Sequence, residues 1–227
     1  MSEQAQDIGK AEVVTTLRRT RDPQRSRHEI LTAAKAEFCR HGFTGARVER
    51  ISKRSHTNPR MIYHYFGNKD GLYLAVLESV YGEIRKQEHE LDLALAEPIE
   101  GMRRLIVFTF DFFARRSDFI ALIANENIMK AKFLKRLPSI QAMTMPLVHS
   151  IRDLLERGHR QGVFRGGVDP VQFYVSIVAQ SQLHISNRHT LSVLFDQDIT
   201  RPDWLAERKA HTIEMLIVYL MAKEPTG

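Results

Sequence analysis

The sequence predicts an all-helical protein, with a small N-terminal helix-turn-helix domain joined by a long helix to a larger C-terminal helical domain. Apolar residues recur at the spacing of an amphipathic helix along most of the chain. Two helix starts are marked by a capping residue followed by proline, at Asn58-Pro59 and Asp169-Pro170. No segment shows the alternating apolar pattern of a half-buried strand, so the all-α class follows.

The N-terminal domain is expected over residues 23–70 and opens with a helix over 24–41. Gly42 ends this helix, because glycine tolerates a positive φ. Two shorter helices, over 47–54 and 59–65, are joined by a tight turn. The first helix carries its apolar stripe at Ile30, Leu31, Ala34 and Phe38.

The short helix after Asn58 is the most informative segment of the chain. Asn58 is its cap and Pro59 its first residue, while Ile62 and Phe66 turn toward the core. A short helix dense in cationic, aromatic and hydroxyl groups is suited to the major groove of DNA. The side chains that give it this character are Arg60, Met61, Tyr63, His64 and Tyr65.

The C-terminal domain is expected over residues 71–227 and consists of helices throughout. A long helix over 68–90 links it to the N-terminal domain. Pro138 and Pro146 bracket a loop or a short helix. The other helices are expected over 101–115, 117–137 (with a break near 125–127), 147–161, 170–187 and 202–222.

The excess of positive over negative charge lies entirely in the N-terminal third of the chain. The formal net charge is +6. Residues 1–70 hold 14 Lys and Arg against 8 Asp and Glu, whereas residues 71–227 hold 19 of each kind. Cationic side chains bind DNA phosphates and release counterions, so this segregation favours a nucleic acid as partner. Other anionic partners also bind basic patches, and charge alone leaves them open.

Composition excludes several classes of protein. Cys39 is the single cysteine, so there is no disulfide framework and no cysteine-based metal site, which is typical of the cytoplasm. No apolar run reaches membrane-spanning length. Residues 1–22 are polar and are expected to form a flexible arm. Residues 1–17 of this arm either take part in binding nucleic acid or are a solubilising tail. The basic entry to the first helix consists of Arg18, Arg19, Arg21, Arg25 and Arg27.

The N-terminal part of the chain resembles the TetR family of bacterial transcription regulators, most strongly over residues 25–77. The resemblance implies a homodimer that binds a palindromic operator in double-stranded DNA, and a C-terminal domain that binds a small-molecule effector and releases the DNA. Repression is the usual role in this family. The matching residues are Ile30-Leu31-Thr32-Ala33-Ala34, Phe38, Gly42-Phe43, Val48, Ile51, Asn58, Ile62-Tyr63-His64-Tyr65-Phe66, Lys69 and Leu72.

The resemblance also implies roles for single residues. Tyr63, Tyr65 and Lys69 stand where the family contacts phosphates, and Arg60 and Met61 stand where it reads bases. Arg60 can pair with guanine O6 and N7, and Met61 can pack on a thymine methyl. Tyr63 and Tyr65 can alternatively be half-buried core aromatics. Arg47 and His64 are two further basic residues expected at phosphates. The predicted DNA-binding residues are therefore Arg47, Arg60, Met61, Tyr63, His64, Tyr65 and Lys69.

Three positions depart from the family pattern. Ala46 replaces a threonine that caps the second helix, so the cap is lost or moves to Thr44. His56 replaces a turn glycine, which costs about 1 kcal/mol if its φ is positive. Ser52 replaces a small apolar residue.

An effector cavity is expected among the helices of the C-terminal domain, because pockets combine apolar walls with a few convergent polar groups. Phe108 and Phe112 can equally be plain core residues, and Asn125 and Asn127 can mark a kink. The candidate lining is Phe108, Phe112, Asn125, Asn127, Met129, His149, Tyr174 and Gln180.

The two last long helices offer more apolar surface than one bundle face needs, which predicts a four-helix dimer interface. The candidate residues are Val175, Val178, Leu183, Ile213, Leu216, Ile217 and Leu220.

An enzyme is the main alternative class. The sequence has no metal-ligand spacing, paired-carboxylate signature, nucleophile elbow or phosphate-binding glycine loop, so we expect no catalysis, no metal and no cofactor. A second alternative is a helical scaffold or ligand-binding protein that does not bind DNA. The segregated charge and residues 58–69 argue against it.

Overall fold

The computed structural model describes residues 22–221, and these residues contain helices and turns but no strand. The predicted all-α class is confirmed. The helices are α1 (Pro23–Gly45), α2 (Val48–Arg54), α3 (Pro59–Phe66), α4 (Lys69–His89), α5 (Pro98–Arg115), α6 (Ser117–Ile128), the 3-10 helix η1 (Leu134–Arg136), α7 (Pro138–Arg160), α8 (Pro170–Ser186), α9 (Arg188–Leu194) and α10 (Pro202–Met221).

The capping signals fix several helix starts. The side chain of Asn58 accepts a hydrogen bond from the Arg60 backbone N–H, at 2.9 Å. Asp169 accepts in the same way from Gln172, at 2.8 Å. Both caps are followed by proline at the first helical position, as the sequence predicts. Asn68 caps α4 through the Gly71 N–H, at 2.8 Å.

Two predictions about the C-terminal helices are wrong. Residues 138–146 are not a loop or a separate short helix, because α7 runs without interruption through Pro146. A proline inside a helix removes one hydrogen bond, and here the packing of α7 against α4, α5 and α8 outweighs that loss. The short helix α9 was not predicted at all. The break expected near 125–127 in the segment 117–137 is present, directly after Ile128.

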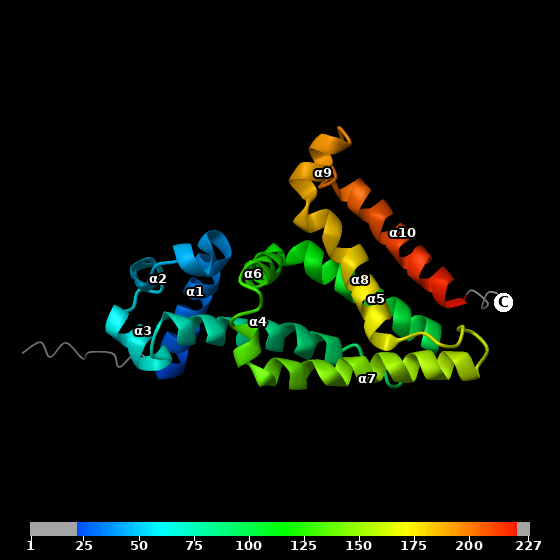
Figure 1. The fold of residues 1–227 in the computed structure, drawn as a ribbon, viewed down its shortest axis with the longest axis horizontal. Coiled ribbons are helices and arrows are strands. Elements are labelled where there is room, and N and C mark those ends of the chain that lie inside the picture. Colours follow the sequence, from blue (N-terminus) through cyan, green and yellow to red (C-terminus); the bar gives the residue numbers. More distant parts are fainter. Residues whose placement is uncertain (1–21, 222–227) are drawn as a thin grey trace, which may run out of the picture.

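The molecule is elongated, with α2 and α3 at one end and α10 near the other (Figure 1). Helix α4 runs from the α2–α3 end along α7 (Figure 1). Helix α5 packs most extensively against α8, and α10 packs on both of them. In this arrangement α4 is the element that spans the length between the N-terminal helices and the C-terminal helices.

One hydrophobic core crosses the boundary expected at residue 70. It contains buried side chains of α1 to α4 together with residues of α5 and α6, and Phe133 before η1. Aromatic rings mark the crossing: Phe133 lies 4.8 Å from Tyr73 and 4.5 Å from Phe43, measured between ring centroids. The N-terminal helices therefore pack directly on α5, α6 and the segment that holds Phe133. A second core lies among α5, α7, α8 and α10.

A buried carboxylate holds the segment between α6 and η1. Glu126 is buried, and its Oε2 accepts hydrogen bonds from the backbone N–H groups of Phe133, at 3.2 Å, and Leu134, at 3.0 Å. Charge-assisted bonds of this kind are stronger than neutral ones. They fix the chain on both sides of the Phe133 ring, which places that ring against the N-terminal helices.

No helix within residues 22–221 has the length and apolar character needed to cross a membrane. The same part of the chain holds no group of three or more His, Cys, Asp or Glu side chains arranged for a metal ion. The predicted basic arm lies outside the described residues, except for Asp22.

Candidate nucleic-acid interface

Helix α3 is anchored by one face and open on the others. Ile62 is buried in the first core, and Phe66 is half-buried against it. Gly67, with a φ of 74°, ends the helix immediately afterwards. Helix α3 lies at one end of the molecule (Figure 1). Because a short helix buries a single face, Arg60, Tyr63 and His64 face solvent.

The predicted DNA-binding side chains of α3 differ in exposure. Arg60 and His64 are exposed, and Tyr63 is 46% exposed. Met61 and Tyr65 are half-buried, and the Tyr65 ring packs against the first core. The alternative of a half-buried core aromatic therefore describes the Tyr65 ring, whereas Tyr63 stands in solvent.

The turn between α2 and α3 departs from the family pattern and is held by buried hydroxyl groups. His56 has a φ of 52°, so the strain expected from replacing a glycine, about 1 kcal/mol, is present. The Ser52 hydroxyl donates to the Thr57 carbonyl, and the Ser55 hydroxyl donates to Ile51 and lies 2.7 Å from the Thr57 hydroxyl. These buried hydrogen bonds hold the turn in its conformation although it has His56 where the family has a glycine.

The second helix is capped from α1, which the sequence reasoning missed. The cap did not move to Thr44, because the N-cap residue is Arg47 and its own side chain makes no capping bond. Instead Glu37 of α1 accepts from the Arg47 backbone N–H, at 3.1 Å, and from Arg50 Nε, at 2.7 Å. Burial alone would raise the pKa of Glu37, but these hydrogen bonds and the Arg50 charge hold it below its usual value.

Lys69 and Arg47 flank α3 from the neighbouring helices. Arg47 is exposed at the start of α2. Lys69 is half-buried at the start of α4, where its Nζ lies 4.8 Å from the centroid of the Phe43 ring and donates to the Thr44 carbonyl at 3.4 Å. Burial lowers the pKa of Lys69. This placement holds its ammonium group beside the loop between α1 and α2.

The described part of the basic entry lies at the start of α1. Arg25 and Arg27 are exposed, and the Arg27 guanidinium lies 5.4 Å from the centroid of the Phe66 ring. The predicted contacts of Arg18, Arg19 and Arg21 lie outside the described residues. Arg27 of α1 thus lies beside the C-terminal end of α3.

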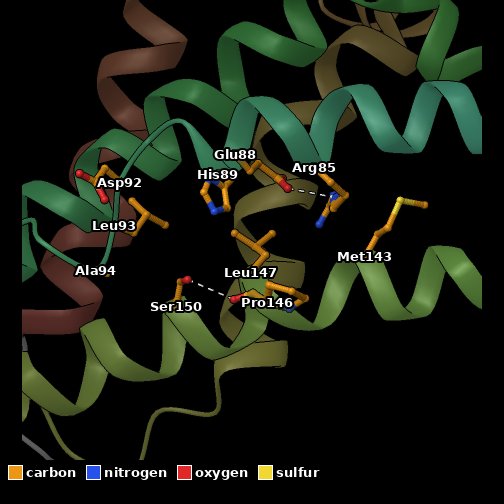
Figure 2. Close-up of a pocket in the computed structure, with 10 residues that line it drawn as sticks. All are labelled: Arg85, Glu88, His89, Asp92, Leu93, Ala94, Met143, Pro146, Leu147 and Ser150. Carbon is orange, nitrogen blue, oxygen red and sulfur yellow. Dashed lines mark hydrogen bonds and ion pairs between the residues drawn. The ribbon is translucent and has the colours of Figure 1, made fainter.

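A cavity of about 210 Å³ lies at the far end of α4, between that helix and α7 (Figure 2). Arg85 and Glu88 of α4 are polar residues of its wall, with the Arg85 Nε 3.0 Å from the Glu88 Oε2. Tyr174 of α8 completes the cluster, because its hydroxyl accepts from Arg85 Nη2 and donates to Glu88 Oε1, each at 3.1 Å. The lining is Arg85, Glu88, His89, Asp92, Leu93, Ala94, Met143, Pro146, Leu147 and Ser150.

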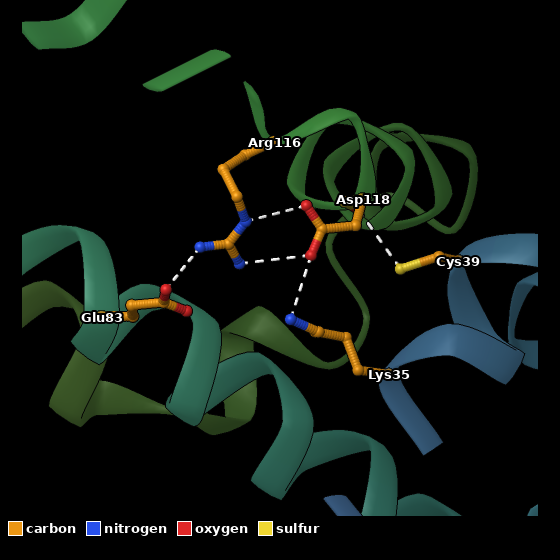
Figure 3. A network of polar contacts seen from close by, with 5 residues as sticks. All are labelled: Lys35, Cys39, Glu83, Arg116 and Asp118. Atoms are coloured by element: carbon orange, nitrogen blue, oxygen red, sulfur yellow. Dashed lines mark hydrogen bonds and ion pairs between the residues drawn. The ribbon is translucent and has the colours of Figure 1, made fainter. Parts of the chain in front are cut away.

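Ionic contacts connect α4, the start of α6 and α1 (Figure 3). Arg116 binds Glu83 of α4, at 2.5 Å, and Asp118 of α6, at 2.9 Å. Lys35 of α1 lies 3.1 Å from the other Asp118 oxygen. Burial alone would raise the pKa of Asp118, but the hydrogen bonds from Arg116 and Lys35 hold it below its usual value. The network links the N-terminal helices to α4 by charge as well as by packing.

The comparisons with known proteins decide the family. The model of the tetR family of bacterial regulatory proteins matches residues 30–76, and that of the tetracyclin repressor-like C-terminal domain matches residues 98–216. The chain belongs to the TetR family. It is therefore a DNA-binding transcriptional regulator, and residues 30–76 contain the whole α2–α3 unit.

Individual relatives agree with the family assignment. The HTH-type transcriptional repressor NicS of Pseudomonas putida is 35% identical over 191 residues, covering 82% of this chain and 90% of the relative. A transcriptional regulator of Streptomyces coelicolor, SCO4942, has a solved structure with a TM-score of 0.62 and 26% identity, covering 84% of this chain and 96% of that one. The fold is shared with AibR in complex with isovaleryl coenzyme A and operator DNA, at a TM-score of 0.64, 18% identity, and coverage of 85% and 98%.

The eight residues predicted for the TetR-family effector pocket do not meet in one cavity. None of them lines the cavity between α4 and α7, although Tyr174 lies directly behind its wall. Phe112 is a core residue, Phe108 and Met129 pack against the first core, and Gln180 binds Arg208 of α10. Asn127 and His149 are exposed.

Asn125 has a different position from the one predicted. It is half-buried on α6 and donates to the Ala121 carbonyl at 2.9 Å. Its Oδ1 lies against Gly42, where a β-carbon would come within 2.8 Å of that oxygen. Gly42 has a φ of 64°, so its missing side chain allows α6 to approach the kink in α1. Asn125 thus belongs to the contact between the N-terminal helices and α6.

The predicted dimer residues of this TetR-family chain divide into two groups. Val175 and Leu183 are exposed on α8, and Val178 and Ile213 are half-buried. Leu216, Ile217 and Leu220 were wrongly assigned, because they are buried in the second core of the same protomer. Their helical phase turns them toward α5 and α8. The apolar side chains that α10 exposes are Met215, Val218, Tyr219 and Met221.

Proposed function

We propose that this protein is a cytoplasmic repressor that binds a palindromic operator as a homodimer and releases it when a small molecule occupies the cavity between α4 and α7. The observation that carries the proposal is the open face of α3 at one end of the molecule, with Arg60 and Tyr63 in solvent. That helix is presented to a partner, and its side chains are those that DNA-reading helices use.

Base recognition is assigned to the first turn of α3. The exposed guanidinium of Arg60 has the fork of donors that matches guanine O6 and N7. Met61 is half-buried beside it and presents an apolar surface suited to a thymine methyl. Phosphate contacts, which set the register of the protein on the duplex, are assigned to Arg47, Tyr63, His64, Tyr65 and Lys69.

Arg60→Ala is expected to relax base preference, whereas Lys69→Ala is expected to weaken binding to all sequences alike. Loss of the guanine contact removes roughly 1–3 kcal/mol of discrimination at one position. Loss of a phosphate contact lowers the salt dependence of log K by about one unit and leaves the preference intact. Fluorescence anisotropy on the upstream region of the gene itself, and on copies with scrambled half-sites, measures both quantities.

A matched control for these variants is Arg152→Ala, because Arg152 is exposed on α7, away from α3. It is expected to leave operator binding unchanged. Equal effects of Arg60→Ala and Lys69→Ala on specific and scrambled DNA would contradict the assigned roles. Absence of binding to any DNA by the wild-type protein would overturn the proposal as a whole.

The dimer is assigned to the outer faces of α8 and α10. These helices pack on the protomer with one side and leave Val175, Leu183, Val218 and Tyr219 exposed on the other. Exposed apolar patches of this kind mark interaction sites, and a two-fold axis buries the same patch from both copies. Two such helices from each subunit give the four-helix arrangement expected from the sequence.

Val218→Lys is expected to shift the protein from dimer to monomer at micromolar concentration and to lower operator affinity at least tenfold. Val218 is 58% exposed, so the lysine is tolerated in the free protomer but places a charge in an apolar interface. Light scattering measures the mass. Leu95→Lys is the control, because Leu95 is exposed between α4 and α5, outside the assigned interface. A dimeric Val218→Lys protein would show that the interface lies elsewhere.

Release follows from linkage. A ligand that binds more tightly to the conformation with unsuitably spaced α3 helices weakens operator binding by the ratio of its two affinities. Helix α4 supports this coupling, since it carries Arg85 and Glu88 at the cavity, Glu83 in the ionic network and Tyr73 in the shared core. A shift of α4 is transmitted to α1 through both contacts.

A further inference from the structure

In the cluster of Arg85, Glu88 and Tyr174, Glu88 is buried and the other two are half-buried, and the hydrogen bonds of the cluster are incomplete. Arg85 Nη2 is bonded to Tyr174 and its Nε faces Glu88, but Arg85 Nη1 is buried without a hydrogen-bond partner. Buried polar groups in proteins are nearly always paired. Arg85 also lines the cavity, so an acceptor on a bound molecule can supply the missing partner when the guanidinium turns toward it.

The rest of the cavity defines the size and character of that group. Its volume of about 210 Å³ suits a small organic molecule. Met143, Pro146 and Leu147 of α7 form an apolar wall facing α4, and Leu93, just after α4, extends it beside Asp92 (Figure 2). An acceptor at Arg85 and an apolar body on this wall describe a small organic acid.

We propose that the cavity between α4 and α7 binds a small monocarboxylic acid, whose carboxylate accepts hydrogen bonds from Arg85 and whose apolar body lies on Leu93, Met143 and Leu147. The inference rests on the proposed function in that it names the chemical class of the effector. Arginine is suited to the site because hydrogen bonds from a charged guanidinium to a carboxylate are stronger than neutral ones, and Nη1 is the nitrogen not already bonded to Tyr174 or facing Glu88.

Glu88 makes this binding dependent on pH. Burial raises the pKa of Glu88 to about 7, against the opposing effects of the Arg85 charge and the Tyr174 hydrogen bond. Below that pH the Glu88 carboxyl group is neutral, and the charge of Arg85 is free to attract an anion. Above it, ionised Glu88 competes with the ligand for Arg85 and repels the ligand carboxylate. Affinity is therefore highest below pH 7 and falls as the pH rises.

Other ionisable groups face the same site and must be separated from Glu88. His89 and Asp92 line the cavity on the side of α4, and Tyr174 contacts Glu88 from α8. The side chains of α7 in the wall, Met143, Pro146, Leu147 and Ser150, do not titrate. Burial raises the pKa of Tyr174, so it stays neutral through the range in which Glu88 titrates. His89 and Asp92 are left as the groups that need their own controls, His89→Gln and Asp92→Asn.

The test compares acids with their amides. Calorimetric titration of the full-length protein with benzoate, pentanoate and hexanoate, and with the corresponding amides, is expected to show binding of at least one acid and at least tenfold weaker binding of its amide. Arg85→Gln is expected to reduce the affinity for that acid at least tenfold, and Arg152→Gln to leave it unchanged. An amide that binds as tightly as its acid, or no binding of any acid, would overturn the inference.

The pH profile provides a second readout that does not depend on Arg85 variants folding. Between pH 6 and pH 8 the dissociation constant of the acid is expected to rise about tenfold, as follows for one competing group with a pKa of about 7. Glu88→Gln is expected to abolish this rise, and His89→Gln and Asp92→Asn are expected to retain it. A rise that persists in Glu88→Gln contradicts the assigned role.

Operator binding without ligand separates the two proposals. If the protein binds operator but neither binds an acid nor releases DNA on its addition, the inference about the ligand fails and the proposed regulator stands. If acids bind through Arg85 but no DNA is bound, the proposed function fails and the site remains.

Discussion

Gly71→Ala is expected to destabilise the protein by about 3 kcal/mol or more and to lower operator affinity still further. A β-carbon at Gly71 would lie 2.1 Å from the backbone carbonyl oxygen of Phe66, and a backbone atom cannot rotate away as a side chain can. The Gly71 N–H also completes the cap of α4 through Asn68. The junction between α3 and α4 must therefore open, which displaces α3 from the orientation that presents Arg60.

The same helix supplies the control. Gly82 of α4 has no atom near the position of an added β-carbon, so Gly82→Ala is expected to stabilise the protein by about 0.5–1 kcal/mol through helix propensity alone. Urea unfolding followed by circular dichroism gives both free energies, and anisotropy gives the operator affinities. A Gly71→Ala protein as stable as wild type would show that the α3–α4 junction is not tightly constrained.

Phe133→Ala is expected to cost about 3–5 kcal/mol of the free energy of unfolding, the usual range for a large buried aromatic side chain. Phe133 is fully buried, and its ring contacts both Phe43 of α1 and Tyr73 of α4. Its removal leaves a cavity where the N-terminal helices pack against the segment between α6 and η1. Phe195→Ala, at a residue that is 69% exposed, is expected to change stability by less than about 0.5 kcal/mol.

The milder variant Phe133→Leu tests transmission, because it keeps an apolar side chain and costs less stability. It is expected to bind operator and ligand separately, while the ligand releases DNA less effectively than in wild type. The ratio of operator affinities with and without ligand measures the coupling free energy. An unchanged ratio would place the coupling on α4 and its ionic contacts instead of on the aromatic cluster.

The N-terminal helices could be predicted closely from sequence, because their signals are local. Asn58 and Pro59 start α3 by capping geometry, and the resemblance to the family marks His56 as the position of a turn glycine, where the φ is indeed positive. Glu37 could not be predicted as a cap, since it comes from another helix and approaches Arg47 only in the folded structure.

The C-terminal helices were predicted less well for physical reasons. Pro146 looks like a boundary, but tertiary packing outweighs the single hydrogen bond that it removes from α7. Apolar residues on α10 cannot be divided by sequence into those facing α5 and those facing a second copy, which is why Leu216 and Leu220 were misassigned. The lining of the cavity was missed because its polar residues, Arg85 and Glu88, look like an ordinary solvated pair on a long helix.

The shared aromatic core has a consequence for anyone who wishes to dissect or re-engineer the protein. If the chain were cut after α3, Phe38, Phe43 and Ile30 would lose side chains that pack against them. The segment α1–α3 is therefore not expected to fold as an independent domain. A chimera that joins α1–α3 to the C-terminal domain of another protein must also include α4, α6 and the segment that ends at Phe133.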